Sequence, residues 1–312
     1  MPEPALRYNP VRWVMEQLDN PFTLDAKIVV WRAMHPRSDV RGCPNVAAKL
    51  ACVTQHILPD GSSESKYGGG VGSVLWTAEA VRWLWLAEGN DSSLLGPSMA
   101  WLQARQHHDG SWTENERVPW GRDWYRSGVA HLWVTGAVLQ ALGAGPPGIR
   151  DMVAKGIAYL TSCLDVFTRL RESTAPPKVY TAFGFDPFSL VVSLETFIQH
   201  ELPFRAASHL RSYLKELQEE DGCWGGSVDI TQCATYGLLL LGESPRSPRL
   251  RRALDYLVGL QNEDGGWSHH QGEPGDWTLT AYTTRLFLAA GATWDSASPS
   301  ASEGHSYREA TT

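Results

Sequence analysis

The chain has 312 residues, of which 43% are hydrophobic and 20% are charged, and its formal net charge at pH 7 is -7. This balance is typical of a globular protein with a sizeable core, and the negative charge argues against a nucleic-acid-binding surface, which would be basic. The five cysteines are an odd number and contain no Cys-x-x-Cys pair, so we expect a reducing compartment rather than a disulfide framework.

The two ends of the chain are predicted to be tails on either side of a single domain. Residues 1–8 lack the apolar core of a signal peptide, and no apolar run approaches the roughly 18 residues of a membrane-spanning helix. We therefore expect a cytoplasmic protein without a transmembrane segment, with peripheral membrane contact left open. Residues 293–312 are rich in Ser and Ala, a composition typical of disorder. A single domain is predicted over residues 9–292.

Two kinds of helix pattern alternate along this domain. Outer-type helices, with one apolar face at the 3.6-residue period, are predicted at residues 11–19, 44–57, 93–105, 148–163, 205–217 and 248–260. Inner-type helices, apolar nearly all round and therefore buried, are predicted at residues 23–34, 73–88, 129–142, 187–199, 229–241 and 277–290. Six of each kind predict an all-α fold, a single (α/α)6 barrel or toroid.

A repeated string joins these helices. Gln-x-x-Asp-Gly-x-Trp stands at residues 106–112, 218–224 and 261–267, and a looser copy without Trp stands at residues 55–61. Gln can bond the backbone of a neighbouring helix end, Asp-Gly makes a tight turn, and Trp covers the joint. The string is therefore interpreted as scaffold. The fourth helix pair lacks it, and residues 167–178 are predicted to be an irregular connection because they contain helix breakers.

The strings and the inner-type sequences Trp76-Thr77-Ala78 and Leu279-Thr280-Ala281 resemble the squalene-hopene and oxidosqualene cyclase superfamily. Protein prenyltransferase β-subunits share the same toroid. The resemblance implies catalysis by protonation, with the middle Asp of an Asp-x-Asp-Asp-Thr-Ala run as the acid at the start of an inner helix. It also implies a second barrel, so this chain would enclose the substrate in its own lumen or require a second subunit.

Two alignments of residues 227–234 with the acid run of the family are open. In the first, Asp229 takes the middle Asp position and Thr231 the Thr position. In the second, Cys233-Ala234 stands opposite Thr280-Ala281, which places Thr231 at the middle position. The second needs no shift relative to the other repeats and is favoured. The prenyltransferase zinc ligands are not matched either, because Thr231 and Leu279 replace the expected Cys and His, so no metal is predicted.

Aligning the inner-type helices on Thr77, Thr135, Cys233 and Thr280 places Ser73, His131, Asp229 and Asp276 four residues earlier, and the fourth helix offers Asp186. Two interpretations stay open for these residues. They can cap helix N-termini, or they can form a ring at the mouth of a cavity, where clustered carboxylates raise one another's pKa. Histidine at position 131 is by default structural, or it pairs with one of the acids.

Further candidates line the same helices. Inner-type residues expected to contact a hydrophobic substrate are Trp76, Trp133, Thr231, Cys233, Tyr236, Trp277 and Tyr282. Arg122 and Arg126, which precede the third inner-type helix, are candidates for a diphosphate or for pairing with the acids. The adjacent pairs His107-His108 and His269-His270 are expected at the surface, because neighbouring side chains rarely converge on one site.

These observations favour a cyclase-like enzyme that acts on a hydrophobic, isoprenoid small molecule by proton-initiated cyclisation or isomerisation. Asp229 is the best acid candidate, with Asp276, Asp186 and His131 in supporting roles. No cofactor is predicted, although a divalent ion could accompany a diphosphate substrate. The alternatives are a non-catalytic or partner-dependent isoprenoid-binding toroid, and a hydrolysis or elimination on the same carboxylates, because a fold alone does not fix the reaction.

Overall fold

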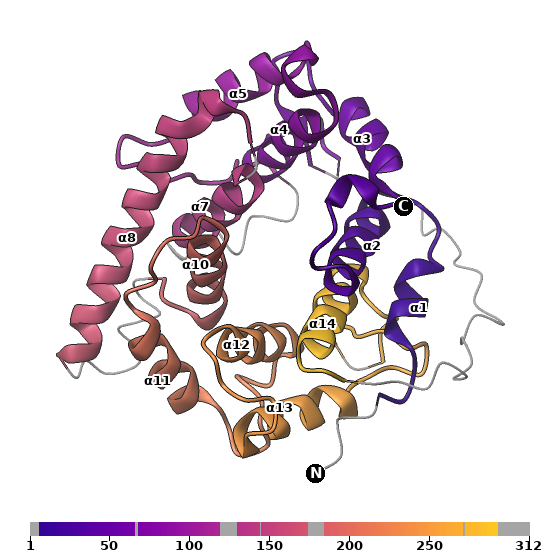
Figure 1. The fold of residues 1–312 in the computed structure, drawn as a ribbon, viewed down its shortest axis with the longest axis vertical. Coiled ribbons are helices and arrows are strands. Elements are labelled where there is room, and N and C mark those ends of the chain that lie inside the picture. Colours follow the sequence, from indigo (N-terminus) through magenta and orange to yellow (C-terminus); the bar gives the residue numbers. More distant parts are fainter. Residues whose placement is uncertain are drawn as a thin grey trace. The chain divides into compact units, whose positions relative to one another are not determined.

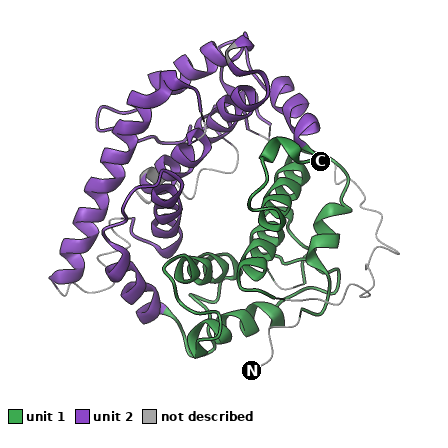
Figure 2. Ribbon diagram, viewed as in Figure 1, with its two compact units in different colours: residues 1–45, 218–312 green, residues 46–217 purple. Residues whose placement is uncertain are grey.

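A computed structural model describes residues 6–65, 68–118, 130–143, 145–173, 184–270 and 272–292. Within these ranges the protein is all-α, as predicted, with twelve α-helices and a short antiparallel pair of strands, β1 (Ser63–Glu64) and β2 (Gly72–Ser73). The chain divides into two compact units, which Figure 2 colours separately: unit 1 comprises Met1–Asn45 with Gln218–Thr312, and unit 2 comprises Val46–Leu217. Each unit is described by itself.

Unit 1 contains five of the helices labelled in Figure 1. Its outer-type helices are α1 (Pro10–Met15) and α13 (Pro248–Gly259), and its inner-type helices are α2 (Pro21–Met34), α12 (Val228–Leu240) and α14 (Trp277–Ala289). Helix α14 packs against α1, α2 and α12, and α13 packs against α12. A 3-10 turn, η1 (Val40–Gly42), follows α2.

Unit 2 contains the other seven helices. The outer-type helices are α3 (Val46–Gln55), α5 (Leu95–Ala104), α8 (Arg150–Glu172) and α11 (Ala207–Leu217). The inner-type helices are α4 (Val74–Glu88), α7 (Ala130–Leu142) and α10 (Pro187–Gln199), and α7 packs between α4 and α10. Two 3-10 turns, η2 (Gly89–Asp91) and η3 (Pro147–Ile149), complete the unit.

All twelve predicted helices form, and most of their ends lie within two residues of the prediction; the larger differences are at the C-terminal ends of α8 and α1. Helix α8 continues to Glu172, so the first part of the predicted connection is helical. The reason is packing: Phe167 is fully buried and its ring contacts Phe185 at 5.4 Å and Tyr213 at 5.6 Å between centroids. Residues 174–178 of that connection lie outside the described part of the chain.

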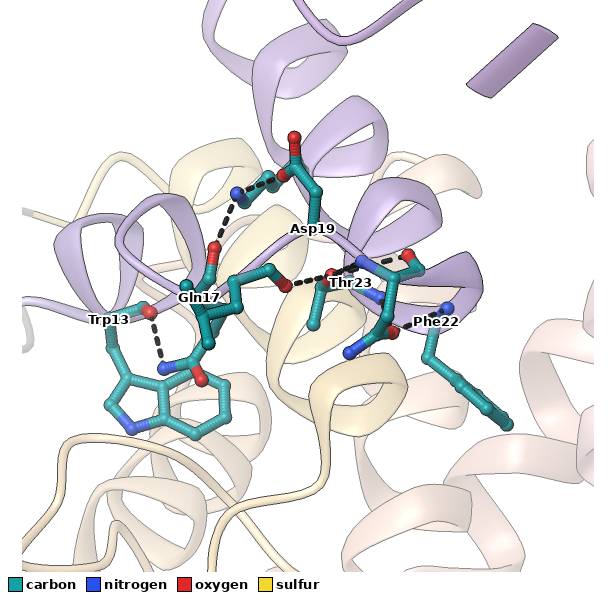
Figure 3. A network of polar contacts seen from close by, with 8 residues as sticks. Trp13, Gln17, Asp19, Phe22 and Thr23 are labelled. Carbon is teal, nitrogen blue, oxygen red and sulfur yellow. Dashed lines mark hydrogen bonds and ion pairs between the residues drawn. The ribbon is translucent and has the colours of Figure 1, made fainter. Parts of the chain in front are cut away.

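Helix α1 ends early because a polar network holds a turn between α1 and α2 (Figure 3). The buried Lys27 Nζ donates to the Gln17 carbonyl at 2.5 Å and to Asp19 Oδ1 at 2.6 Å. Asn20 and Thr23 form a reciprocal capping box that begins α2. The network therefore fixes the start of α2, next to Phe22, whose ring lies 5.8 Å from that of Trp277 on α14.

The repeated strings form joints within each unit. Gln106 Nε2 donates to the Met152 carbonyl at 2.9 Å, and Gln218 Nε2 donates to the Arg249 carbonyl at 3.1 Å. In both cases the acceptor lies at the beginning of the next outer-type helix, which is the scaffold role predicted for Gln. The Gly of each string adopts a positive φ; at Gly222 a Cβ would meet the Arg252 carbonyl carbon at 2.5 Å, so only Gly fits this close approach.

Large aromatic side chains fill the cores beside these joints. The Trp of each full string is buried, and Trp267 packs with Leu254, Leu257, Leu286 and Phe287 in the core of unit 1. The indole Nε1 of Trp267 donates to the Leu257 carbonyl at 2.7 Å. None of the described helices combines the length and the apolar character needed to cross a bilayer.

Candidate functional site

A hydrogen bond from a backbone N–H to a threonine hydroxyl sets the position of four inner-type helices, α4, α7, α12 and α14, against their joints. The hydroxyl of Thr135 accepts from Trp112 N at 2.9 Å, and that of Thr280 accepts from Trp267 N at 2.9 Å. On α12 the equivalent acceptor is Thr231, whose hydroxyl accepts from Trp224 N at 3.0 Å. Thr77 makes the same bond to Ser63 N at 2.9 Å.

These four bonds correct the alignment of the inner-type helices. Thr231, not Cys233, is equivalent to Thr280, so the favoured second alignment is wrong and the first agrees with the structure. The residue four positions before the threonine is then Ser227, which caps α12 by accepting from Ile230 N at 3.3 Å. Asp229 is therefore not the helix cap that one interpretation expected. It is the second residue of α12 and lies in the first turn of the helix.

Asp229 has two ionisable neighbours in unit 1. Its Oδ2 lies 3.9 Å from Nδ1 of His269, on the loop between the third string and α14. Burial raises the pKa of Asp229 above its usual range, His269 opposes the rise, and the nearby Asp276 carboxylate adds to it. The Asp229 side chain is 35% exposed. A carboxyl group held toward its neutral form is a proton donor.

Asp276 and Trp277 begin α14 beside this acid. Asp276 is the N-cap, as one interpretation predicted: its Oδ1 accepts from Leu279 N at 2.7 Å. The partly buried Trp277 packs with Phe22 of α2. Asp229, Asp276 and Trp277 are thus brought together at the starts of two neighbouring helices of one unit. His269, which was expected only at the surface, joins them because the loop folds back toward α12.

Tyr236 and Tyr282 surround an arginine rather than an empty space. The guanidinium carbon of Arg285 lies 4.1 Å from the ring centroid of Tyr236 and 4.8 Å from that of Tyr282. A cation over the face of a tyrosine ring is attracted by the negative π surface. Sequence reasoning missed Arg285, because a single arginine in an apolar helix gives no repeat or motif.

Thr231 and Cys233, predicted as substrate contacts, are buried instead. Thr231 has no exposed surface and its hydroxyl is used in the joint with Trp224, while Cys233 is 7% exposed. Thr231 is buried because its hydroxyl faces the joint, and a side chain that faces the joint cannot also face the opposite side of the helix. The role of Cys233, two residues farther along α12, stays a prediction.

The remaining candidates belong to unit 2. Asp186 caps α10, since its Oδ1 accepts from Ser189 N at 2.9 Å and its Oδ2 from the Ser189 hydroxyl at 2.6 Å. Burial raises the pKa of Asp186 against the effect of these hydrogen bonds. The ring of Trp133 on α7 lies 5.7 Å from that of Phe188. The predicted ring of Asp186, Asp229 and Asp276 spans two units and stays a prediction.

Other candidates are placed only in part. Trp76 lies in the first turn of α4 and is partly buried. Histidine 131 is in the first turn of α7, and its side chain lies outside the described residues. Arg122 and Arg126 also lie outside them, so their role in binding a diphosphate stays a prediction.

Possible metal ligands also occur in the described residues. Glu219, Asp221 and Cys223 place their ligand atoms within 4.8 Å of one another. These atoms accept hydrogen bonds from the second string and from the two glycines that follow it: Asp221 Oδ1 from Cys223 N at 3.0 Å, Glu219 Oε1 from Gly225 N at 2.8 Å, and Cys223 Sγ from Gly226 N at 3.3 Å. Burial raises the pKa of Cys223 to about 11, so a metal would have to displace a firmly held proton.

The chain matches a family model by sequence and solved structures by fold. Residues 189–296 match the family model of the squalene-hopene cyclase C-terminal domain. The apo structure of the type II terpene cyclase MstE from Scytonema is similar with a TM-score of 0.56 and 13% identity, over 86% of this chain and 88% of that chain. The fold is that of the type II terpene cyclases. No curated protein matches the chain by sequence.

Two further solved structures show the same fold. MstE in complex with its product, merosterolic acid A, matches with a TM-score of 0.58 and 13% identity, over 90% of this chain and 94% of that chain. A protein from Actinoplanes matches with a TM-score of 0.58 and 16% identity, over 91% and 99% of the two chains. The match covers nearly the whole MstE chain. A second barrel in the same chain is therefore not a general feature of this fold.

Proposed function

We propose that this protein is a type II terpene cyclase-like enzyme that protonates an isoprenoid substrate and closes one or more rings. The observation that carries the proposal is the position of Asp229. By its hydrogen bond, Thr231 is equivalent to Thr280, which supports the alignment of Asp229 with the acid of the family. The Asp229 side chain is partly exposed, and its pKa is raised. The same carboxyl group was the best acid candidate in the sequence.

In the proposed step, the Asp229 carboxyl proton is transferred to one carbon of a carbon–carbon double bond. A C–H bond forms at that carbon and the π bond breaks, so its other carbon becomes a carbocation. A neighbouring double bond attacks this carbon and forms the ring bond, which leaves the positive charge on the other carbon of that double bond. Transfer of a proton from the carbon next to this cation to water forms a double bond in the neutral product, and the Asp229 carboxylate takes up a proton from water before the next turnover. The proton comes from a carboxyl group, so the step requires no redox partner.

His269 and Asp276 have complementary effects on this acid. A protonated imidazole beside the Asp229 carboxylate stabilises the charged form left after proton transfer, and this makes Asp229 a stronger acid. The Asp276 carboxylate has the opposite effect and helps to retain the proton before reaction. Burial and Asp276 thus raise the pKa of Asp229 while His269 lowers it, and a carboxyl group with a raised pKa is suited to general acid catalysis. We assign both as positioning residues.

The substrate is proposed to lie against the inner-type helices of unit 1, next to Asp229. Support comes from the MstE fold and from the aromatic side chain of Trp277, which is partly buried at the start of α14. Aromatic faces stabilise carbocations, and an enclosed site protects them from water. MstE has been solved with geranylgeranyl dihydroxybenzoate as its substrate, which favours a polyprenyl chain as the reacting part here.

The test is product formation from linear isoprenoids. The purified protein would be incubated with prenyl diphosphates, a prenylated benzoate and squalene-like hydrocarbons, and cyclic products would be sought by mass spectrometry. Asp229→Asn should lower turnover by about 10²–10⁴-fold, the usual contribution of a general acid. Asp255→Asn, an exposed carboxylate on α13 that pairs with Arg251, is the matched control. Unchanged turnover of a folded Asp229→Asn protein would remove Asp229 from the mechanism.

A further inference from the structure

The side chain of the second residue in each full string bonds the residue six positions later, just after the Trp. The three pairs are His107 with Thr113 at 3.0 Å, Glu219 with Gly225 at 2.8 Å, and Asn262 with Ser268 at 3.3 Å. Each string therefore holds the chain that leaves its joint, in addition to forming the joint. After the third string, this chain carries His269, the neighbour of Asp229.

The loop after the third string is held by its outgoing and by its returning arm. The structure describes residues 268–270 and 272–275 of this loop. Asn262 Nδ2 donates to the Ser268 hydroxyl and also to the Glu273 carbonyl, at 3.0 Å, so one amide joins both arms to the string. The buried Ser268 hydroxyl in turn donates to the His270 carbonyl at 2.7 Å. The residues on the two sides of His269 are thereby bonded to each other and, through Ser268, to the string.

The base of the same loop is closed by Asp264 and by two glycines. Asp264 Oδ1 accepts from Gly266 N at 2.8 Å inside the string, and its Oδ2 accepts from Gly275 N at 3.0 Å across the base of the loop. A Cβ on Gly275 would meet Gly266 Cα at 3.0 Å and Trp13 Cζ2 at 2.9 Å. The two ends of the loop thus lie in close contact beside Trp13, and the Asp264 carboxylate bonds both of them.

His269 depends on such support because its own side chain is half exposed. The imidazole is 49% exposed, and its Nδ1 lies 3.9 Å from Asp229 Oδ2. Holding an exposed side chain in one place costs conformational entropy, and the attraction between opposite charges weakens as their separation grows. Bonds that fix the chain on both sides of His269 lower the entropic cost of keeping the imidazole beside the acid.

We propose that Asn262, Asp264 and Ser268 are positioning residues for the proposed acid and that they act through His269. We call these three residues the loop anchor. Without the loop anchor the imidazole moves away from Asp229, and the carboxyl group holds its proton more tightly, as it does after the loss of His269 itself. This inference rests on the proposed function, because it names the residues that prepare its acid. It gives the third string a second role besides that of scaffold.

Ser268→Ala removes one buried hydroxyl and tests the proposal through the pH dependence of turnover. We expect kcat on the plateau to fall about fivefold, the equivalent of one hydrogen bond. Activity should persist to higher pH, as expected for a weaker acid, and KM should stay unchanged. The matched control is Ser111→Ala, since Ser111 is also buried and its hydroxyl donates to Asp109 Oδ1 at 2.7 Å in the first string. The control should keep the wild-type pH profile.

A double variant separates positioning from a general structural effect. If Ser268 acts through His269, its hydroxyl is without consequence once the imidazole is gone, so Ser268→Ala/His269→Gln should match His269→Gln alone. Independent effects would multiply, and the double variant would lose about fivefold more. Asp264→Asn leaves one acceptor oxygen for two N–H donors and should shift the pH profile in the same direction. Asn262→Ala should do likewise, and it decides if Ser268→Ala does not fold, because Asn262 is only partly buried.

The pH dependence of stability measures the same effect without a substrate. The pKa of Asp229 is raised in the folded protein, so Asp229→Asn gains stability relative to its parent between about pH 3 and about pH 7. Loss of the imidazole raises this pKa further and enlarges the gain. As a ratio of unfolding constants from urea titrations, the gain should be about fivefold larger in Ser268→Ala and Asn262→Ala proteins than in Ser111→Ala protein.

The outcomes separate this proposal from the proposed function. If no linear isoprenoid is turned over but the stability gain is larger in both variants, the cyclase function fails while the loop anchor stands. If products form but both variants keep the wild-type pH profile, or if the double variant loses fivefold more than His269→Gln, the loop anchor is wrong while the cyclase function stands. An unchanged stability gain in both variants overturns the loop anchor whatever the turnover.

Discussion

Nδ1 of His269 lies 3.9 Å from Oδ2 of Asp229, although forty residues of chain, including all of α13, separate the two. The pair exists because the loop after the third string returns to the start of α12. The pair changes the pKa of Asp229. Burial raises this pKa, and the neighbouring His269 lowers it. The proposed acid strength of Asp229 therefore depends on His269, which is proposed to act without contacting the substrate.

Replacing His269 by Gln should shift the pH dependence of turnover. Without the imidazole the pKa of Asp229 rises further, so activity should persist to higher pH before the acid loses its proton. The acid is then weaker, and kcat on the plateau should fall about tenfold, a minor part of the 10²–10⁴-fold that a general acid supplies. The pH–kcat profile measures both effects. His270→Gln is the control, and a His269→Gln profile identical to it would remove the positioning role.

The stability of Asp229→Asn should depend on pH in a defined direction. The pKa of Asp229 in the folded protein is raised above its usual value of 3.8, so its contribution to stability is complete below that value and is lost as pH rises through the folded pKa. Asn does not ionise and avoids this loss. The free energy of unfolding of the variant relative to wild type should therefore increase from about pH 3 to about pH 7.

Urea unfolding at several pH values checks this expectation. Asp255→Asn on α13 serves as the comparison, because its side chain is 54% exposed and should show no such increase. A relative stability of Asp229→Asn that decreases with pH would mean that Asp229 is stabilised as a carboxylate, and it would argue against an acid at this position.

Thr231→Val should destabilise the protein by about 1–3 kcal/mol, because the buried Trp224 N–H then loses its acceptor. Thr235→Val is the matched control on the same helix. Its hydroxyl donates at 2.6 Å to the Thr231 carbonyl, so its loss strands no buried N–H and should cost about 1 kcal/mol or less. Denaturant midpoints measure both. Equal costs would show that the joint does not set the register of α12.

Gly222→Ala should cost about 3 kcal/mol or more, since the new Cβ would lie 2.5 Å from the Arg252 carbonyl carbon and φ is +97°. Gly226→Ala tests the backbone effect alone. Gly226 has a φ of +64° and nothing within 4 Å of an added Cβ, so about 1–2 kcal/mol is expected from the left-handed conformation. Thermal unfolding compares the two. Similar losses would mean that the close approach at Gly222 relaxes easily.

Much of the fold follows from local sequence. The 3.6-residue period predicted every helix of both types, because the burial of one face or of all faces is written into a single helix. Capping by Asp186 and Asp276 was also predictable, since an N-cap bonds within its own first turn. The extension of α8 was not, because Phe167 is held by Phe185 and Tyr213, which follow later in the chain.

The register of α12 shows where sequence reasoning stopped. The backbone donor and the threonine acceptor lie 23 residues apart for Trp112 and Thr135, 13 for Trp267 and Thr280, and only 7 for Trp224 and Thr231. Because the connection varies in length, the similarity of Cys233-Ala234 to Thr280-Ala281 was misleading, and only the hydrogen bond identifies the equivalent residue.

The sequence by itself determined the helix types, the joints and Asp229 as the best acid candidate, because repeats and helix periods are local patterns. Only the tertiary structure decided that Thr231 is equivalent to Thr280, that His269 and Asp276 adjust the pKa of Asp229, and that Arg285 lies between Tyr236 and Tyr282. Burial, charge and ring contacts act through space between residues far apart in the chain. No spacing along the sequence specifies them.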